Sequence, residues 1–302
     1  MGLPEPAPVF DLPRRRSRLR AAVVSLRPRQ WTKNLLLFAG IIFAAKLGDL
    51  SRWGEALAAF AAYCAASSAS YLVNDVRDAP HDRVHPTKRA RPIARGELSP
   101  RLAEVIAVLL LFSAVFLVAP LGLASIFCLC AFFALQAAYT LKLKHIVLLD
   151  VMAIAGLFVI RAAAGAAAVE VRISPWLLLC TALLALFLAL AKRRGELVLV
   201  GAEATPGRPV LEGYSLALVD QLVTVVAAST VISYCLYTFT ARDSKAMMIT
   251  IPFVVFGVFR YLLLMHRHDL GEEPEEVLLR DVPILVCIAG WTVVAAVILK
   301  LS

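Results

Sequence analysis

Three common signals are missing from this chain of 302 residues. Its six cysteines all fall inside apolar segments without the spacing of a disulfide framework or a zinc site, so we interpret them as small buried hydrophobic residues. Residues 1–20 are polar and rich in arginine, and they lack the apolar core of a secretory signal peptide. The apolar segments are continuous rather than alternating, which argues against the strands of a membrane barrel.

The overall composition is typical of a membrane protein. Hydrophobic residues make up 60% of the chain, whereas a soluble domain has about 45–50% apolar residues. The formal net charge is +9, but the basic residues sit in short segments between apolar runs, so this charge does not indicate nucleic acid binding. We expect a polytopic membrane protein whose basic side chains meet anionic lipids and phosphorylated substrates.

Nine segments are apolar and long enough to cross a bilayer, which takes roughly 20 residues in a helix. The sequence therefore predicts an all-α membrane protein, a bundle of nine transmembrane helices. The predicted spans lie near residues 33–50, 54–74, 102–119, 121–141, 146–168, 174–192, 216–240, 246–265 and 282–300.

The distribution of lysine and arginine predicts the orientation of these spans. With a cytoplasmic N-terminus, 23 of the 31 lysines and arginines fall on the cytoplasmic side, six fall on the opposite side and two lie inside spans. Because positive residues favour the inner side, we expect the N-terminus inside and the C-terminus outside the cell (inner) membrane. The long polar segments 75–101, 193–215 and 266–281 then share the cytoplasmic face, where we expect the active site.

The domain organisation expected from these features is simple. Residues 1–32 are interpreted as a cytoplasmic N-terminal tail and interfacial segment, and residues 33–302 as a single transmembrane catalytic domain. Faces of small residues on the helices permit a homo-oligomer, but they do not require one.

An acidic motif follows the second predicted span. Asn74, Asp75, Asp78 and Asp82 place one amide and three carboxylates where a helix should meet water. On a helix, positions 74, 78 and 82 share a face and 75 lies beside 78. Hard oxygen ligands favour Mg²⁺, so we predict that these four residues hold magnesium and that the three aspartates are catalytic. The alternative is a solvated helix end with ordinary acidic caps.

A basic segment comes directly after the acidic motif. Lys88, Arg89 and Arg91 can contact phosphate oxygens, and arginine can do so through two parallel hydrogen bonds. The alternative is an ordinary positively charged cytoplasmic segment, which accounts for part of this charge. We predict that at least one of the three contacts a phosphate of the substrate.

Further polar residues lie at or within the later spans. Tyr139 and Lys142 end the fourth predicted span, where they are either interfacial anchors or substrate contacts. Arg161 lies inside an apolar run, which favours a functional role, although an ion pair with Asp150 is an alternative.

A second basic cluster ends the sixth predicted span. Lys192, Arg193 and Arg194 are followed by Glu196, a combination that suits an anionic substrate with a metal ion. The alternative is a positively charged stop at the inner face of the membrane. We include these four residues among the predicted substrate-binding side chains.

Together these residues resemble the UbiA superfamily of membrane prenyltransferases. Asn74 to Asp82 matches in full the first acidic motif of that superfamily, N-D-x-x-D-x-x-x-D, and Tyr139 with Lys142 also resembles it. The resemblance implies a helical bundle of the UbiA type, a Mg²⁺ cofactor and transfer between a diphosphate and a second substrate. The usual second acidic motif is replaced by Lys192–Glu196, which has one carboxylate and puts a second full magnesium site and a prenyl diphosphate donor in doubt.

The segments at 27–34, 85–94, 192–197 and 210–214 resemble one branch, the decaprenyl-phosphate phosphoribosyltransferases. This implies that Lys33 contacts substrate, and that phosphoribosyl pyrophosphate donates a 5-phosphoribosyl group to a polyprenyl phosphate for cell-wall arabinan precursors. The alternative enzyme is a UbiA-type prenyltransferase that moves a polyprenyl group from its diphosphate to an aromatic acceptor. A transporter is disfavoured because the acidic residues gather at one water-facing end of the spans.

Overall fold

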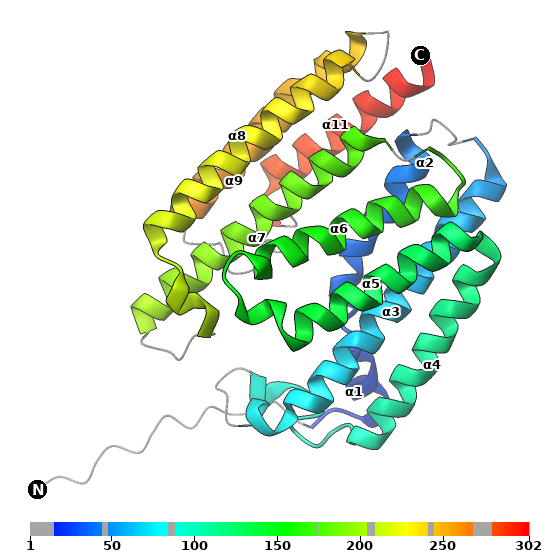
Figure 1. Cartoon of the computed structure of the whole chain (residues 1–302), viewed down its shortest axis with the longest axis vertical. Helices are drawn as coiled ribbons and strands as arrows, with labels where there is room; N and C mark the ends of the chain where they lie inside the picture. Colours follow the sequence, from blue (N-terminus) through cyan, green and yellow to red (C-terminus); the bar gives the residue numbers. More distant parts are fainter. Residues whose placement is uncertain are drawn as a thin grey trace, which may run out of the picture. The chain divides into compact units, whose positions relative to one another are not determined.

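The computed structural model describes residues 15–43, 48–83, 88–172, 174–203, 209–240, 245–267 and 280–301. Within these ranges every regular element is a helix, as Figure 1 shows. The ten α-helices described are α1 (Arg18–Ser25), α2 (Ala39–Phe43), α3 (Leu50–Asp82), α4 (Pro100–Val118), α5 (Leu123–Leu141), α6 (Leu149–Ala168), α7 (Pro175–Glu203), α8 (Leu216–Thr240), α9 (Ile251–Arg267) and α11 (Val282–Leu301). Shorter 3₁₀ segments are Pro28–Phe38, Lys88–Ala90, Ala119–Leu121, Leu143–His145, Pro209–Gly213 and Lys245–Thr250.

Seven described helices are long and apolar enough to cross a membrane, and a shorter apolar helix covers Val282–Ile298. The seven are Leu50–Asp82, Pro100–Leu121, Leu123–His145, Leu149–Ala168, Pro175–Leu199, Leu216–Thr240 and Lys245–Arg267. The all-α class of a multi-pass membrane protein is therefore confirmed. The predicted count of nine spans is not confirmed, and the predicted orientation of the N-terminus is not confirmed either.

The first predicted span, residues 33–50, is the main difference between prediction and structure. The chain forms 3₁₀ turns over Pro28–Phe38 and then only the five residues of α2, while residues 44–47 lie outside the description. Hydropathy alone could not reveal this, because the buried amide of Asn34 and close packing of Leu37 against α6 hold the chain in a tighter turn.

The described chain groups into two compact units. The first takes in the described residues of Met1–Thr32 and Ala62–Phe116, and the second takes in those of Lys33–Ala61 and Leu117–Ser302. The first has a core in which α1, the second half of α3, the segment before α4 and α4 itself meet. The buried members of that core are Ala21, Ala69, Leu72, Ala79, Ile93, Leu98, Ala103 and Ala107.

In the second unit α5, α6, α7 and α8 pack in sequence order, each against the next, as Figure 1 shows. Helices α9 and α11 pack against one another, and α9 also packs against α8. The apolar core of this unit includes Phe187 of α7 and Tyr261 of α9, whose rings meet edge to face at 5.3 Å. Alternating chain directions bring the ends of α5, α7 and α9 to the starts of α6 and α8.

Gly165 of α6 provides a test of the close packing in the second unit. A Cβ atom at this position would lie 2.0 Å from the backbone oxygen of Leu37, so Gly165→Ala must push α6 and the 3₁₀ segment apart. We expect a net destabilisation of about 1–3 kcal/mol, read as a lower midpoint of thermal unfolding in detergent. Gly54→Ala in α3 is the control, because its Cβ would enter open space among the described residues and alanine favours a helix. An unchanged midpoint for Gly165→Ala would contradict the packing described.

Candidate functional site

The acidic motif lies on the last turns of α3, inside the first unit. Asp75 and Asp82 are seven residues apart, or about two helical turns, so they project from the same side of α3. Only 3% and 5% of their side-chain surfaces are exposed. One guanidinium nitrogen of Arg91, Nη1, lies 3.1 Å from Oδ1 of Asp75 and 2.7 Å from Oδ2 of Asp82. Two buried carboxylates therefore converge on one positive charge.

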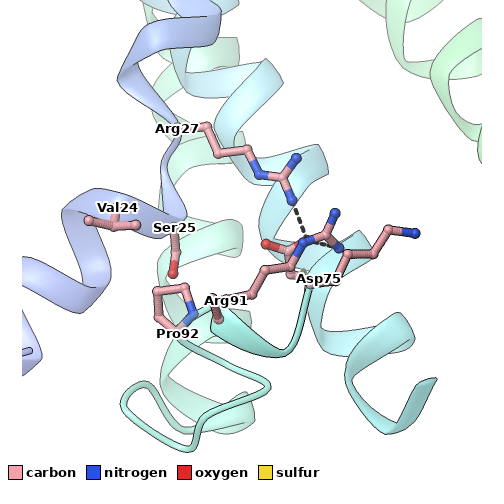
Figure 2. A pocket seen from close by; sticks show the side chains of 8 residues that line it. Val24, Ser25, Arg27, Asp75, Arg91 and Pro92 are labelled. Atoms are coloured by element: carbon pink, nitrogen blue, oxygen red, sulfur yellow. Dashed lines mark hydrogen bonds and ion pairs between the residues drawn. The ribbon is translucent and has the colours of Figure 1, made fainter. Parts of the chain in front are cut away.

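Asp75 has a second cationic partner, which was not among the predicted site residues. Nη2 of Arg27 donates to Oδ1 of Asp75 at 2.6 Å, and the guanidinium carbon lies 4.8 Å from the ring centroid of Tyr71. Figure 2 shows Arg27 and Arg91 both directed at Asp75. The available signal was the position of Arg27 at the start of the segment 27–34, which contributes to the family resemblance.

These side chains line a pocket of about 340 Å³ within the first unit, drawn in Figure 2. Arg27, Lys88 and Arg91 contribute positive charge to the pocket, and Asp75 contributes the carboxylate. Guanidinium and ammonium groups donate strong hydrogen bonds to phosphate oxygens. The pocket therefore has the chemistry to hold a phosphorylated ligand. Its remaining lining residues are Val24, Ser25, Ala90 and Pro92.

The predicted basic segment lies beside this pocket. Lys88 and Arg89 belong to the 3₁₀ segment Lys88–Ala90 and are half-buried, and Arg91 follows them directly. His85 and its neighbours at 84–87 lie outside the described residues. The structure thus brings Lys88 and Arg91 to the same pocket as Asp75.

A buried carboxylate supports the backbone of this segment. Glu97 has 1% of its side chain exposed and accepts hydrogen bonds from the backbone N–H and Nη1 of Arg16, while Nε of Arg95 lies 3.3 Å away. Nη1 of Arg16 also donates to the carbonyl oxygen of Ala90. Burial, the largest single influence, raises the pKa of Glu97, but the hydrogen bonds from Arg16 and the charge of Arg95 outweigh it, so its pKa lies below the usual range.

Asn74 and Asp78, the other members of the predicted metal set, are half-buried on α3. Among the residues that the structure describes, no three His, Cys, Asp or Glu side chains gather closely enough to hold a metal ion. The carboxylates of Asp75 and Asp82 nevertheless fit a hard divalent cation, because both are oxygen donors and both already face one cationic group. The four-residue magnesium set stays a prediction.

The second basic cluster lies in the second unit, on α7 rather than in the predicted loop 193–215. Helix α7 continues to Glu203, because this stretch is rich in good helix formers and Arg193 pairs with Glu196 one turn later. Lys192 is half-buried, whereas Arg193 and Arg194 are buried. The residues 204–208, including Arg208, lie outside the described part of the chain.

Arg193 is enclosed by acidic groups. Its Nε lies 2.8 Å from Oδ2 of Asp150, an ion pair by distance in which the N–H is not aligned with the oxygen. Its Nη1 donates to Oε2 of Glu196. Oδ1 of Asp150 accepts a hydrogen bond from the hydroxyl of Tyr214 at 2.7 Å. This arrangement connects the start of α6, α7 and the segment before α8.

The side chain of Arg194 contacts two other helices, α8 and α9. Its Nε lies 2.7 Å from Oδ1 of Asp220 at the start of α8, and its Nη1 donates to the carbonyl oxygen of Met265 in the last turn of α9. Arg193 and Arg194, which the sequence predicts to bind substrate, therefore both have described partners within the protein.

Arg161 is buried in α6 with polar and aromatic partners. Its Nε donates to Oδ1 of Asn34 at 2.8 Å, and its Nη1 donates to the carbonyl oxygen of Leu157. The guanidinium carbon lies 4.9 Å from the ring centroid of Phe132 and 5.4 Å from that of Phe158, at cation–π distance. The alternative ion pair between Arg161 and Asp150 is wrong in this structure, because Asp150 faces Arg193 instead.

The remaining predicted contacts lie at the edges of the second unit. Lys33 is half-buried in the 3₁₀ segment before α2. Tyr139 is half-buried in the last turn of α5, and Lys142 is exposed directly after that helix ends. Their roles toward substrate stay predictions.

Comparison with solved structures identifies the fold. A UbiA homolog from Archaeoglobus fulgidus bound to GPP and Mg²⁺ superposes with a TM-score of 0.71 at 16% identity, covering 93% of this chain and 100% of that chain. A digeranylgeranylglyceryl phosphate synthase superposes with a TM-score of 0.67, covering 94% of this chain and 99% of its own. At this identity the likeness shows the fold alone.

Comparison with curated sequences gives nearer relatives. The decaprenyl-phosphate phosphoribosyltransferase of Mycobacterium tuberculosis is 36% identical over 289 residues, which cover 91% of this chain and 93% of the relative. The enzyme of the same name from Mycolicibacterium smegmatis is 34% identical over 289 residues, covering 89% of each chain. Residues 35–279 match the UbiA prenyltransferase family as a whole. The helical fold, the acidic motif on α3 and this match over most of its length make the chain a member of the UbiA prenyltransferase family.

Proposed function

We propose that this protein transfers a 5-phosphoribosyl group from phosphoribosyl pyrophosphate to a polyprenyl phosphate, with release of diphosphate. Similarity to decaprenyl-phosphate phosphoribosyltransferases over about nine-tenths of both chains supports this reaction over others of the family. Decaprenyl phosphate is the acceptor that the names of those relatives indicate, and synthesis of cell-wall arabinan precursors is the corresponding role.

The structural observation that carries the proposal is the pocket around Asp75. It combines three cationic side chains, Arg27, Lys88 and Arg91, with a carboxylate that shares Arg91 with Asp82. A diphosphate carries several negative charges and needs both cationic hydrogen-bond donors and a counter-ion. This donor set suits the pyrophosphate of phosphoribosyl pyrophosphate.

The reaction requires one bond to form and one to break. An oxygen of the acceptor phosphate forms a bond to the anomeric carbon of the ribose, and the bond from that carbon to the pyrophosphate oxygen breaks, with the electron pair leaving on diphosphate. The acceptor phosphate is already anionic near pH 7, so the protein needs no strong general base. Its own contribution is to orient the two substrates and to stabilise negative charge on the leaving group through Arg27, Lys88 and Arg91.

Asp75 and Asp82 are the residues that would hold a divalent cation, with Asp78 and Asn74 in support. When bound, Mg²⁺ supplies Lewis-acid neutralisation of the pyrophosphate charge. Arg91 has a related role, since its one positive charge lies beside both carboxylates and offsets part of their negative charge.

The membrane setting follows from the same proposal. We place the protein in the cell membrane with its N-terminus and its active site on the cytoplasmic side, because most lysines and arginines then lie inside. The isoprenoid tail of the acceptor would lie among apolar helices, with its phosphate at the water-facing rim.

A donor assay tests the proposed reaction against its nearest rival. Purified protein in lipid nanodiscs is supplied with polyprenyl phosphate and phosphoribosyl pyrophosphate labelled in the ribose, with or without a chelator of divalent cations. We expect label in a lipid product, and loss of that product when the chelator is present. Consumption of a polyprenyl diphosphate in a parallel reaction with an aromatic acceptor, and no consumption of phosphoribosyl pyrophosphate, would instead assign the protein to the prenyltransferases.

A further inference from the structure

The turn that follows α1, within the first unit, carries a further inference. Helix α1 ends at Ser25, and Leu26 keeps a right-handed helical backbone with a φ of −69°. Arg27 comes next with a φ of +54°, in the left-handed region. Helices often end with a residue in this conformation, but that residue is usually glycine, because a side chain there is strained. The turn therefore holds Arg27 in an unfavourable backbone conformation.

Ser68 of α3 fixes this turn from the side. It is 1% exposed, and its hydroxyl donates to the carbonyl oxygen of Leu26 at 2.8 Å. The same hydroxyl accepts a hydrogen bond from Nε1 of Trp31 at 3.0 Å. The carbonyl oxygen of Arg27 accepts from the backbone N–H of Gln30 at 2.9 Å. One buried hydroxyl thus contacts the chain before and after Arg27, using its donor as well as an acceptor position.

The same side of α3 receives the side chain of Arg27. Ser68, Tyr71 and Asp75 are spaced by three and four residues, so they form one row along the helix. The guanidinium carbon of Arg27 lies 4.8 Å from the ring centroid of Tyr71, and its Nη2 donates to Oδ1 of Asp75 at 2.6 Å. This row therefore contacts both the turn that carries Arg27 and the guanidinium that lines the pocket.

The strained backbone makes the direction of the Arg27 side chain depend on Ser68. Without the Ser68 hydroxyl, the carbonyl oxygen of Leu26 loses this hydrogen bond, and Arg27 can relax toward the common negative values of φ. A change of φ redirects the side chain, so the guanidinium would leave its place beside Asp75. A glycine at this position would end α1 without strain. Strain that is kept beside a pocket favours a functional reason for the arginine.

We propose that Ser68 is a positioning residue for the pocket, which fixes the turn at Leu26 and so directs the guanidinium of Arg27 at a diphosphate. This rests on the proposed function, since it assigns a diphosphate group to the pocket around Asp75. Trp31 supports Ser68 by donating to its hydroxyl. Arg27 contacts the ligand, whereas Ser68 and Trp31 act through Arg27.

Binding of inorganic diphosphate to a Ser68→Ala variant provides the test. Titration calorimetry with the purified protein in lipid nanodiscs and Mg²⁺ gives the Kd and the fraction of protein that binds. We expect the Kd to rise about three- to tenfold, because a misdirected Arg27 loses its charge-assisted hydrogen bonds to the ligand. If Ser68 only supported the fold, the substitution would lower the fraction that binds and leave the Kd unchanged.

Ser70→Ala is the matched control for Ser68→Ala. Ser70 lies on the same helix, and its hydroxyl donates to the carbonyl oxygen of Ala66 within α3 at 3.0 Å. The change therefore removes a hydroxyl group of the same kind from α3 while leaving the hydrogen bond to Leu26 in place. The Kd for diphosphate should equal that of wild type.

A double-variant cycle tests whether Ser68 acts through Arg27. In an Arg27→Gln background the guanidinium is absent, so adding Ser68→Ala should change the Kd by less than about twofold. Effects that multiply would show that Ser68 acts on the pocket by another route. If Ser68→Ala does not fold, Trp31→Phe replaces it in the cycle, since it removes the N–H that donates to Ser68 and should raise the same Kd by a smaller factor.

The outcomes separate this inference from the proposed function. Diphosphate is released in the proposed reaction and in the alternative prenyl transfer, so the binding test does not depend on the donor. If the wild-type protein binds diphosphate but forms no lipid product from phosphoribosyl pyrophosphate, the proposed reaction alone fails. The positioning role is overturned if wild type does not bind diphosphate, or if folded Ser68→Ala, or Trp31→Phe in its place, keeps the wild-type Kd. Multiplying effects in the cycle overturn it as well.

Discussion

An Asp75→Asn variant is expected to lose turnover by about two to three orders of magnitude. The substitution keeps the size of the side chain but removes the charge on which Arg27 and Arg91 both converge. A neutral amide would bind a divalent cation more weakly and would leave both guanidinium groups without their shared carboxylate. Initial rates of lipid product formation at saturating donor and Mg²⁺ measure the effect.

Glu104→Gln is the control for Asp75→Asn. Glu104 lies in the same unit on α4 and is exposed, so this change removes one negative charge from the unit without touching the pocket. Its rate should stay within about twofold of wild type, as is usual for surface substitutions. The folded state of each variant is checked by its elution profile and its thermal unfolding. Near-normal turnover of a folded Asp75→Asn protein would contradict the assigned role.

An Arg91→Gln variant is expected to show two separate effects of Arg91, one on the stability of the fold and one on turnover. In the absence of Mg²⁺ it should unfold several degrees below wild type, because Asp75 and Asp82 lose the guanidinium that they share. Addition of Mg²⁺ should then stabilise the variant more than it stabilises wild type, since the ion replaces the missing positive charge. Turnover should still fall by about tenfold to a hundredfold, because one donor to the phosphate groups is gone.

The control for Arg91→Gln is Arg101→Gln, because Arg101 is an exposed arginine near the start of α4. The Arg101→Gln variant should unfold at the same temperature as wild type, and Mg²⁺ should raise its unfolding temperature by the same amount. Differential scanning fluorimetry with and without Mg²⁺ gives both quantities for the three proteins. An equal Mg²⁺ effect in wild type and Arg91→Gln would show that the ion does not bind beside these carboxylates.

Much of the fold follows from hydropathy, but not all of it. The predicted span 216–240 coincides with α8, and 146–168 and 282–300 agree with α6 and α11 within three residues. The predicted first span is not one continuous α-helix over its described residues, because apolar composition reports burial and not helix type. The 3₁₀ turns of Pro28–Phe38 depend instead on tertiary contacts, such as that of Leu37 with Gly165.

The sequence predicted which acidic and basic residues belong to the candidate site more reliably than it predicted which of them contact one another. The spacing of Asp75 and Asp82 gives their common face directly once a helix is assumed, and the structure places both residues on Arg91. The sequence could not show that Arg27 joins them, since it lies 48 positions before Asp75. It also could not show that Arg193 is enclosed by Asp150, because that pairing depends on the packing of α6 against α7.

Position-specific labelling of phosphoribosyl pyrophosphate tests the central claim most directly. Two preparations of the donor are compared with the purified protein and polyprenyl phosphate, one with ³²P in the 5-phosphate and the other with ³²P in the terminal phosphate of the pyrophosphate. Transfer of a phosphoribosyl group predicts that the first label enters the lipid and that the second appears in water as diphosphate. Entry of the second label into the lipid, or of neither, would contradict the account.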